Sequence, residues 1–156
     1  MTDMNQIDRT ICGLLQGDGR LSSAEIAEAV GLSVSAANER VRRLSTQGVV
    51  RGYHAVLDPE IVGAGTCALV LIDMAYDGEA EACAALVARP EVMELHHISG
   101  SHSYLAKLRL RDTRALQGFL QAHLKPLRAV QKTETMMSLD VLKETLAVPI
   151  AVDGDA

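Results

Sequence analysis

Aromatic residues are scarce in this chain of 156 residues, which has no tryptophan and only one phenylalanine. Any hydrophobic core must therefore be built mainly from aliphatic side chains. Hydrophobic residues make up 48% of the sequence and charged residues 22%, a composition typical of a folded, soluble protein. The length allows one ordinary domain or two small ones.

Long apolar runs are also missing. No run reaches the roughly 18 residues of a candidate membrane span, and the first ten residues, MTDMNQIDRT, lack the apolar core of a signal peptide. The three cysteines, Cys12, Cys67 and Cys83, are scattered, and no two form a CxxC pair. These absences favour a cytoplasmic protein with reduced, buried thiols and no membrane association.

Motifs for catalysis are absent as well. The sequence has no glycine-rich phosphate loop, no nucleophile motif and no HExxH zinc motif. His102 lies between Ser101 and Ser103, but neighbours on a tight turn rarely have the geometry for proton transfer, and no orienting acid is evident. We therefore expect no enzymatic activity and no cofactor.

The formal net charge of −5 at first argues against a nucleic-acid partner. A DNA-binding face, however, needs only a local cluster of basic residues. Residues 33–54 contain four arginines and one glutamate, which gives this stretch a net charge of +3. The position of these arginines therefore matters more than the overall charge.

Apolar residues at helical spacing predict a first helix near the N-terminus. They are Ile7, Ile11, Leu14 and Leu15. The Gly-Asp-Gly sequence at 17–19 ends this helix. Ser22 and Glu25 have the spacing of a capping box, which predicts the start of a second helix. Gly31 closes the second helix, because glycine adopts the left-handed conformation at lowest cost.

A third helix is predicted from Ser33, its N-cap, to about Gln47, and Gly48 stops it. The very short turn between the second and third helices is typical of a helix-turn-helix. One face of the third helix is apolar and must point at the first two helices. This face consists of Val34, Ala37, Val41 and Leu44.

The predicted DNA contacts lie at the start and on the solvent side of the third helix. They are Ser33, Ser35, Ala36, Asn38, Glu39, Arg40, Arg42 and Arg43. A recognition helix places its N-terminal residues against base edges, and the small side chains at this end allow a close approach. Arg42 and Arg43 are the strongest candidates, because arginine binds guanine O6 and N7 or clamps phosphates.

Two of these residues have a competing interpretation. Glu39 can accept a hydrogen bond from cytosine N4, but we favour an i,i+4 pair in which it orients Arg43. Arg40 borders the apolar face, so an ion pair inside the protein is an equal alternative to a phosphate contact. On an isolated helix such charges would indicate only a solvated face. The capped helix pair and the basic stripe together favour DNA contact.

The rest of the chain has the pattern of a small sheet with two helices. Residues 49–57 (VVRGYHAVL) are predicted as an extended linker strand. Further strands are predicted at 66–75, 92–99, 104–110 and 130–138, and helices at 78–88 and 116–124. This βαββαβ order is that of a ferredoxin-like domain. The strand at 104–110 alternates apolar and basic residues, which we interpret as an edge-type strand. Residues 153–156 are predicted to be disordered.

We therefore expect an α+β fold with two domains. A helix-turn-helix domain spans 1–49, a hinge strand and linker span 50–64, and a ferredoxin-like domain spans 65–156.

Three segments resemble the leucine-responsive regulatory protein/AsnC (Lrp/AsnC) family of bacterial and archaeal regulators. They are IDRTICGLLQGDGRLSSAEIAEAVGLS, ERVRRLSTQGVVRGYHAVLDP and ISGSHSYLAKLRL. The likeness covers nearly the whole chain, and GLSxSxxxxRVRRL followed by GVVRGY is quite specific. It implies an N-terminal (winged) helix-turn-helix and a C-terminal ferredoxin-like domain of the RAM or ACT-like type. In the family, this second domain dimerises through its sheet, often assembles four dimers into an octamer, and binds amino acids or related metabolites between dimers.

The turn between the two middle strands departs from the family pattern. The family often has Gly-Asp-x-Asp-Tyr there, whereas this chain has Gly100-Ser101-His102-Ser103-Tyr104. Two hydroxyls thus replace two carboxylates that could hold the ammonium group of an effector. The departure leaves open which effector is used, and whether one is used.

If an effector binds, the resemblance places it near this turn. The candidate residues are Ser99, Gly100, Ser101, His102, Ser103, Tyr104, Thr133, Glu134 and Thr135. The polar groups of the turn suit an α-carboxylate or an ammonium group, and Tyr104 could wall the pocket. The alternative is a simple exposed hairpin turn, which is polar because it is solvated.

A metal-sensor interpretation rests on His96, His97 and His102, with Cys67 or Cys83 as further ligands. His96 and His97 are adjacent on a predicted strand, so their side chains leave on opposite faces and cannot easily share one ion. No standard spacing of metal ligands occurs. We expect no metal site.

The sequence thus predicts a transcriptional regulator that binds double-stranded DNA as a homodimer or larger assembly and responds to an amino acid or related metabolite. An effector-independent architectural DNA-binding protein and a metal-responsive regulator are the alternatives.

Overall fold

The computed structural model describes residues 4–151. The predicted disorder of 153–156 lies outside these residues. The chain divides into two compact units: one contains the N-terminal residues up to Val56 together with the segment from Glu144 onward, and the other is Leu57–Lys143. Each unit has its own hydrophobic core.

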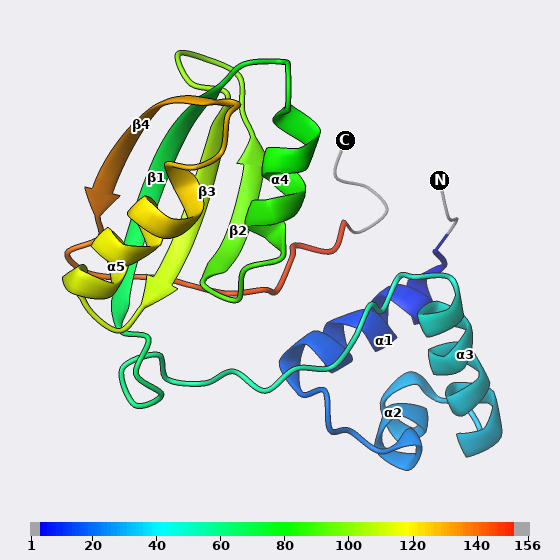
Figure 1. Ribbon diagram of the computed structural model, residues 1–156. Helices are drawn as coiled ribbons and strands as arrows, with labels where there is room; N and C mark the ends of the chain where they lie inside the picture. The colour runs from blue at the N-terminus through cyan, green and yellow to red at the C-terminus, as the bar shows by residue number, and fades with distance from the viewer. Residues whose placement is uncertain (1–3, 152–156) are drawn as a thin grey trace. The chain divides into compact units, whose positions relative to one another are not determined.

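The N-terminal unit contains three helices, α1 (Gln6–Gly17), α2 (Ser23–Val30) and α3 (Val34–Thr46) (Figure 1). The predicted capping box of α2 is confirmed: Ser22 N donates to the Glu25 carboxylate at 2.7 Å, and Glu25 N donates to Ser22 Oγ at 3.3 Å. Gly31 follows α2 with a left-handed φ of 67°. The turn between α2 and α3 is therefore as short as predicted.

The core of this unit is built from all three helices. Its buried members are Ile11, Cys12, Ile26, Ala27, Ala37 and Leu44. Val41 packs against them, as expected for the apolar face of α3. Val34 was expected on the same face but is 52% exposed, because it is the first residue of the helix and lies at the rim.

Residues 49–57 do not form the predicted strand. A strand needs a hydrogen-bonded partner, and no segment within 4–151 pairs with these residues. The amides of Val49 and Val50 instead donate to Leu44 O, at 2.9 and 3.2 Å, which finishes the end of α3. Val56 and Leu57 remain 93% and 64% exposed. The sequence of this segment is typical of a strand, but no other strand in the described part of the chain pairs with it.

The C-terminal unit has the predicted βαββαβ order. Its elements are β1 (Thr66–Met74), α4 (Glu79–Val87), β2 (Val92–His97), β3 (Tyr104–Leu110), α5 (Thr113–Phe119) with the π-helical turn η1 (Leu120–Leu124), and β4 (Val130–Met137). The four strands form one antiparallel sheet in the order β2-β3-β1-β4. This is the arrangement of a ferredoxin-like domain. α4 and α5 lie on the same face of the sheet (Figure 1).

Two predicted boundaries are wrong by a few residues. α5 begins at Thr113 instead of 116, because Asp112 caps it: Ala115 N donates to Asp112 Oδ1 at 2.7 Å. β2 ends at His97 instead of Ser99, because the chain turns away after the last pair of its ladder, His97 with Tyr104.

The strand at Tyr104–Leu110 was predicted as an edge strand, and this is wrong: β3 lies between β2 and β1. Its alternating pattern has a different cause, which is the two faces of the sheet. Ala106 and Leu108 are buried under the helices, whereas Lys107 faces the other side and pairs with Glu94 at 3.0 Å. The edges of the sheet are β2 and β4.

Residues 144–151 were expected to belong to the C-terminal domain, but they belong to the N-terminal unit. Their backbone is hydrogen bonded to side chains of α1, through Gln16 and Arg9. The described residues of the C-terminal unit therefore end at Lys143.

The three cysteines are free, as expected. Cys12 and Cys67 are buried, and Cys83 is half-buried. Burial, with a smaller contribution from Asp8, raises the pKa of the Cys12 thiol above its ordinary value of 9.0. The Cys12 thiol is therefore held in its less reactive, protonated form.

Candidate DNA-binding face and effector site

The N-terminal end of α3 presents small polar side chains, as predicted. Ser33 Oγ accepts a hydrogen bond from Ala36 N at 3.3 Å and so caps the helix. It also lies 3.1 Å from Ser35 Oγ. Both serines are exposed. This end of α3 therefore offers hydroxyl groups and little steric bulk to a partner that approaches it.

Arg42 lies on the solvent side of α3, where its side chain is 74% exposed. It pairs with Glu39: the Nε–Oε2 distance is 3.2 Å and the Nη2–Oε1 distance is 3.1 Å. The hydrogen bond with Glu39 raises the pKa of Arg42, so the guanidinium is charged at any physiological pH. The predicted i,i+4 pair between Glu39 and Arg43 is wrong, because Glu39 is occupied by Arg42 and Arg43 has another partner.

That partner is Asp8 on α1. The Asp8 side chain is only 4% exposed and binds two arginines of α3: Arg43 Nη2 at 2.8 Å and Arg40 Nη1 at 2.9 Å. Arg40 therefore makes the internal ion pair that the sequence left as one of two alternatives. Arg43 is still 46% exposed. It is held at one end of its guanidinium while the rest faces solvent.

Sequence patterns did not identify Asp8 as a member of this site. It precedes Arg40 and Arg43 by 32 and 35 residues, and only the packing of α1 against α3 brings it there. Its only local signal was a charged residue next to the apolar stripe of α1. Asn38, the remaining predicted contact, is exposed, and its Oδ1 accepts a weak hydrogen bond from Ser23 Oγ of α2 at 3.4 Å.

In the C-terminal unit, His102 lies in the turn between β2 and β3 and contacts residues of two strands, β1 and β4. Its Nδ1 lies 3.0 Å from Asp73 Oδ1 on β1, and its Nε2 lies 3.8 Å from Glu134 Oε2 on β4. The imidazole is only 14% exposed. The structure thus brings together two of the predicted effector residues, His102 and Glu134. It adds Asp73, which no sequence pattern identified because it lies inside a nearly continuous apolar strand.

The other predicted effector residues do not converge on this cluster. Thr133 and Thr135 alternate with Glu134 along β4, so they face the opposite side of the sheet. Ser99 and Ser101 are exposed in the turn, and Gly100 adopts a φ of 129° that favours glycine.

Ser103 is tied into the sheet through its backbone, because its N–H donates to Ile72 O at 3.1 Å. Tyr104 was expected to wall a pocket at the turn, but it belongs to the core under the helices. Its hydroxyl donates to Glu79 Oε1 at 3.0 Å, and its ring stacks on His97 with centroids 4.8 Å apart. A hydrogen bond with Cys83, together with burial and Glu79, raises the pKa of Tyr104 above its ordinary value of 10.0.

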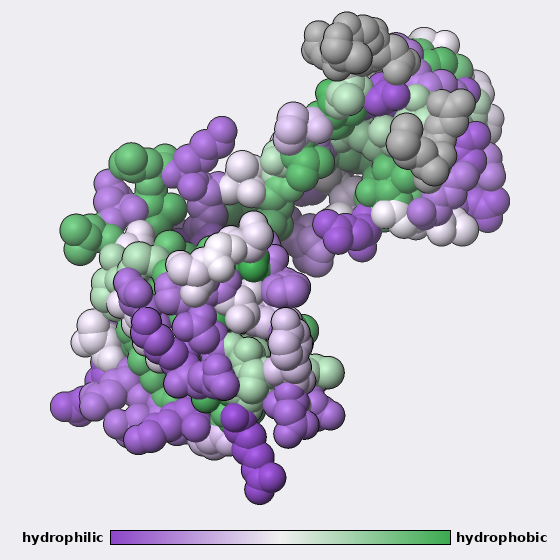
Figure 2. Space-filling view, turned by 90° about the horizontal axis from the view of Figure 1, so that it is seen from above, coloured by the Kyte–Doolittle hydropathy of each residue, from purple (hydrophilic) through white to green (hydrophobic). Residues whose placement is uncertain are grey.

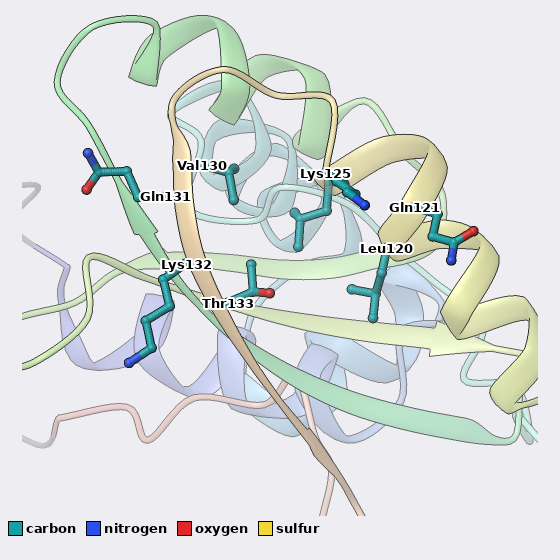
Figure 3. Close-up of a pocket in the computed structure, with 8 residues that line it drawn as sticks. Leu120, Gln121, Lys125, Val130, Gln131, Lys132 and Thr133 are labelled. Carbon is teal, nitrogen blue, oxygen red and sulfur yellow. The ribbon is translucent and has the colours of Figure 1, made fainter.

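A shallow cavity of about 270 Å³ lies between η1 and β4. Val130 and Thr133 of β4 face Leu120 of η1 across it, while Lys132 points away from the helix (Figure 3). Thr133 is the one predicted effector residue that lines this cavity. The cavity and the His102 cluster are therefore on different faces of β4.

The prediction that His96 and His97 point to opposite faces of the sheet is confirmed. His96 Nε2 lies 3.0 Å from Glu94 Oε2, whereas His97 stacks on Tyr104. Within residues 4–151, no three histidine, cysteine or acidic side chains are grouped so that they could hold a metal ion. Among the helices formed by these residues, none has the length and apolar character of a membrane span.

Two protein families match the chain. The family described as "Winged helix-turn-helix DNA-binding" matches residues 4–51, and the "Lrp/AsnC ligand binding domain" family matches residues 67–148. No hairpin that would form a wing follows α3 within the part of the chain that the structure describes.

Curated relatives match over almost their whole length. The HTH-type transcriptional regulator FL11 of Pyrococcus furiosus is 33% identical, over 94% of this chain and 97% of its own. The leucine-responsive regulatory protein of Salmonella typhimurium is 37% identical, over 92% and 89%.

Solved structures of similar proteins have the same fold. A transcriptional regulator from Neisseria meningitidis, solved in complex with L-Met, superposes with a TM-score of 0.88 at 30% identity and covers 94% of this chain and 97% of its own. The leucine response regulatory protein of Mycobacterium tuberculosis superposes with a TM-score of 0.84 at 34% identity and covers 95% and 100%. The chain described here belongs to the Lrp/AsnC family and is a DNA-binding transcriptional regulator with a ligand-binding domain.

Proposed function

We propose that α3 reads promoter DNA with Arg42 and Arg43, and that the C-terminal unit makes this binding depend on an amino acid or a related metabolite. The observation that carries the first half is the exposed face of α3. Its two guanidinium groups lie opposite Ala37 and Leu44, which are 0% and 1% exposed. The helix is therefore anchored by one face and offers charge on the other.

The two arginines have different roles in this proposal. Arg43 is fixed by Asp8, so it presents a pre-oriented donor group and loses little side-chain entropy on binding. Arg42 is held only by Glu39, whose side chain is 64% exposed. Glu39 keeps Arg42 extended until DNA replaces it as the partner. Ser33, Ser35, Ala36 and Asn38 approach the bases or the backbone beside them.

For the effector, we propose the cluster around His102. Relatives carry the names of leucine-responsive regulators, and one was solved with L-Met. The family's two acidic turn residues are Ser101 and Ser103 here, but Asp73 and Glu134 bring two carboxylates to the same histidine. These carboxylates suit an ammonium group, and the exposed Ser101 hydroxyl suits an α-carboxylate.

We further propose that the chain works in the cytoplasm as a homodimer that assembles into an octamer. The sheet face away from α4 and α5 supports dimerisation, because it carries Leu69, Leu71 and Leu105 in the middle of the sheet. A two-fold symmetric dimer binds two half-sites separated by about one helical turn or a multiple of it. Footprinting on genomic DNA fragments would test this proposal, because it predicts paired, inverted protected segments.

Calorimetric titration of the twenty amino acids into the intact protein tests the effector half. We expect heat for at least one amino acid, and no heat for the same one with His102→Ala. A protein that binds DNA but gives no heat with any candidate would be an effector-independent architectural protein. A gel shift that responds to a chelator would instead indicate a metal-responsive regulator.

A further inference from the structure

The segment that follows the C-terminal unit has no helix or strand, yet its backbone is hydrogen bonded by side chains. Gln16 of α1 makes a reciprocal pair with Val148: Gln16 Nε2 donates to Val148 O at 3.0 Å, and Val148 N donates to Gln16 Oε1 at 2.7 Å. A side-chain amide thus pairs with a main-chain amide as a neighbouring strand would. Arg9 Nη1 donates to Ala151 O at 2.6 Å.

This segment docks on one face of α1. Arg9, Gly13 and Gln16 are spaced by four and three residues, so they share one face of the helix. Ile150 packs against the core of the N-terminal unit, and its Cδ1 lies 3.9 Å from where a Cβ of Gly13 would be. Ile150 therefore lies directly over the Gly13 position of α1.

The sequence of the segment fits an extended ligand. Pro149 has no N–H, so the position directly after Val148 carries no backbone donor that docking would have to satisfy. It also restricts Val148 to an extended backbone, which lowers the entropy lost on docking. The contact is selective as well: Ile150 is half-buried, whereas Leu142 and Leu146 are 92% and 83% exposed.

We propose that residues 146–151 form a strap that docks on α1 and completes the DNA-binding unit. The chain passes from one unit to the other at two places, after Val56 and after Lys143. A docked strap therefore adds a non-covalent attachment of the segment after Lys143 to α1. α1 also holds α3 through Asp8, the neighbour of Arg9. Docking of the strap therefore contributes to the stability of the helix on which the recognition helix rests.

The test uses the full-length protein with two matched pairs of variants. Gln16→Ala removes the reciprocal pair, and Gln6→Ala is its control, because Gln6 is an exposed glutamine of the same helix. Ile150→Asp breaks the apolar contact, and Leu146→Asp is its control at an exposed position. The readouts are amide hydrogen exchange of Val148 and the thermal unfolding of the N-terminal unit followed by NMR.

In the parent protein, the Val148 amide should exchange about tenfold or more slowly than in a free peptide, as expected for one hydrogen bond worth about 1.4 kcal/mol. Gln16→Ala and Ile150→Asp should abolish this protection and lower the unfolding midpoint of the N-terminal unit by several degrees. The two control variants should do neither. A chain that ends at Thr145 should show the same loss, and a synthetic LAVPIA peptide should restore the midpoint.

Two results would overturn the proposal. One is a Val148 amide in the parent protein that exchanges as fast as in the free peptide. The other is an N-terminal unit that unfolds at the same temperature in the parent, in Gln16→Ala and in the shortened chain. Both readouts are independent of DNA and of any effector, so failure here leaves the proposed regulatory function untouched.

Discussion

Asp8 is the one charged residue that is buried among the described residues of the DNA-binding unit. It is buried in α1 and neutralised by Arg40 and Arg43 of α3. A buried carboxylate is stable only when its oxygens are paired, and here each oxygen has its own arginine. The Asp8 carboxylate therefore holds α1 and α3 at a fixed angle. Its bond to Arg43 also orients that side chain, which is a proposed DNA contact.

Asp8→Asn should destabilise the N-terminal unit. The amide keeps the shape of the carboxylate but loses the charge, and its NH2 group faces an arginine donor. Because both arginines are partly exposed, we expect a loss of about 1–3 kcal/mol. Urea unfolding followed by NMR signals of α1–α3 measures it, and Asp77→Asn, on an exposed loop, is the control. Equal midpoints for the two variants would show that the pair contributes nothing.

Arg42→Ala should weaken DNA binding without affecting folding, because the side chain is exposed and bonded only to Glu39. If Arg42 reads a base pair, the loss is about 1–3 kcal/mol with relaxed specificity at that position. A gel-shift titration at fixed salt concentration measures it. Arg114→Ala, an exposed arginine of α5, is the control. Unchanged affinity for Arg42→Ala would refute the role given to this residue.

At the scale of elements, the helix-turn-helix depends on how each helix begins and ends. α2 begins with a capping box and ends at a left-handed glycine, and α3 begins two residues later with its own serine cap. Each cap satisfies backbone groups that the helix itself leaves free. These caps fix the length of the turn, and the turn fixes where the recognition helix points.

Gly31→Ala should destabilise the N-terminal unit by about 1–2 kcal/mol, because a Cβ strains the left-handed conformation at φ 67° although no atom lies within 4 Å of it. Gly17→Ala is a sharp control. It is also free of contacts within 4 Å, but its φ is not positive and it lies inside α1. We expect that control to be neutral or slightly stabilising in thermal unfolding. A higher thermal unfolding midpoint for Gly31→Ala than for Gly17→Ala would contradict the proposed backbone strain at position 31.

Acid should weaken α2 through its capping box. Hydrogen bonds from Ser22 lower the pKa of Glu25 below its ordinary value of 4.5. A lowered folded-state pKa means that the stabilisation is fully present above about 4.5 and is lost as the pH falls through the folded-state value. An NMR titration of the Glu25 carboxyl should give a higher midpoint in Ser22→Ala than in the parent protein. Identical midpoints would mean that the box does not form in solution.

At the scale of the whole molecule, the open face of the sheet is where we expect a second copy to bind. Leu71 and Leu105 are directly paired across β1 and β3 on the face away from the helices. Hydrophilic residues cover much of the visible surface of both units (Figure 2), and Lys107, Glu94 and His96 border the leucines on the open face. An apolar centre with a polar rim is the usual composition of a protein interface.

Leu105→Glu should therefore convert the assembly into monomers that still fold. The side chain is only half-buried in the isolated unit, so a carboxylate there keeps its hydration in the monomer and loses it in the dimer interface. Sedimentation velocity measures the mass. Tyr76→Glu, at a 96% exposed position before α4, should leave the dimer intact. A Leu105→Glu protein with the parent's mass would exclude this face as the dimer interface.

The sequence alone was sufficient for features that depend on neighbours along the chain. The capping box of Ser22 and Glu25, the glycine stop at Gly31, and the βαββαβ order all rest on local backbone chemistry and hydropathy period. The exposed side of α3, with Arg42 on it, follows from the same period. These features were predicted because a cap or a stripe needs only a few adjacent residues.

Tertiary structure alone decided the features that join distant residues. Asp8 became the partner of Arg43, Asp73 became the partner of His102, β3 became central, and the C-terminal segment docked on Gln16. None of these has a local signature, since an ion pair or a sheet order depends on which surfaces meet after folding. The reason is physical: hydropathy shows which face of an element is buried, but the identity of the side chain opposite it depends on the packing of the whole unit.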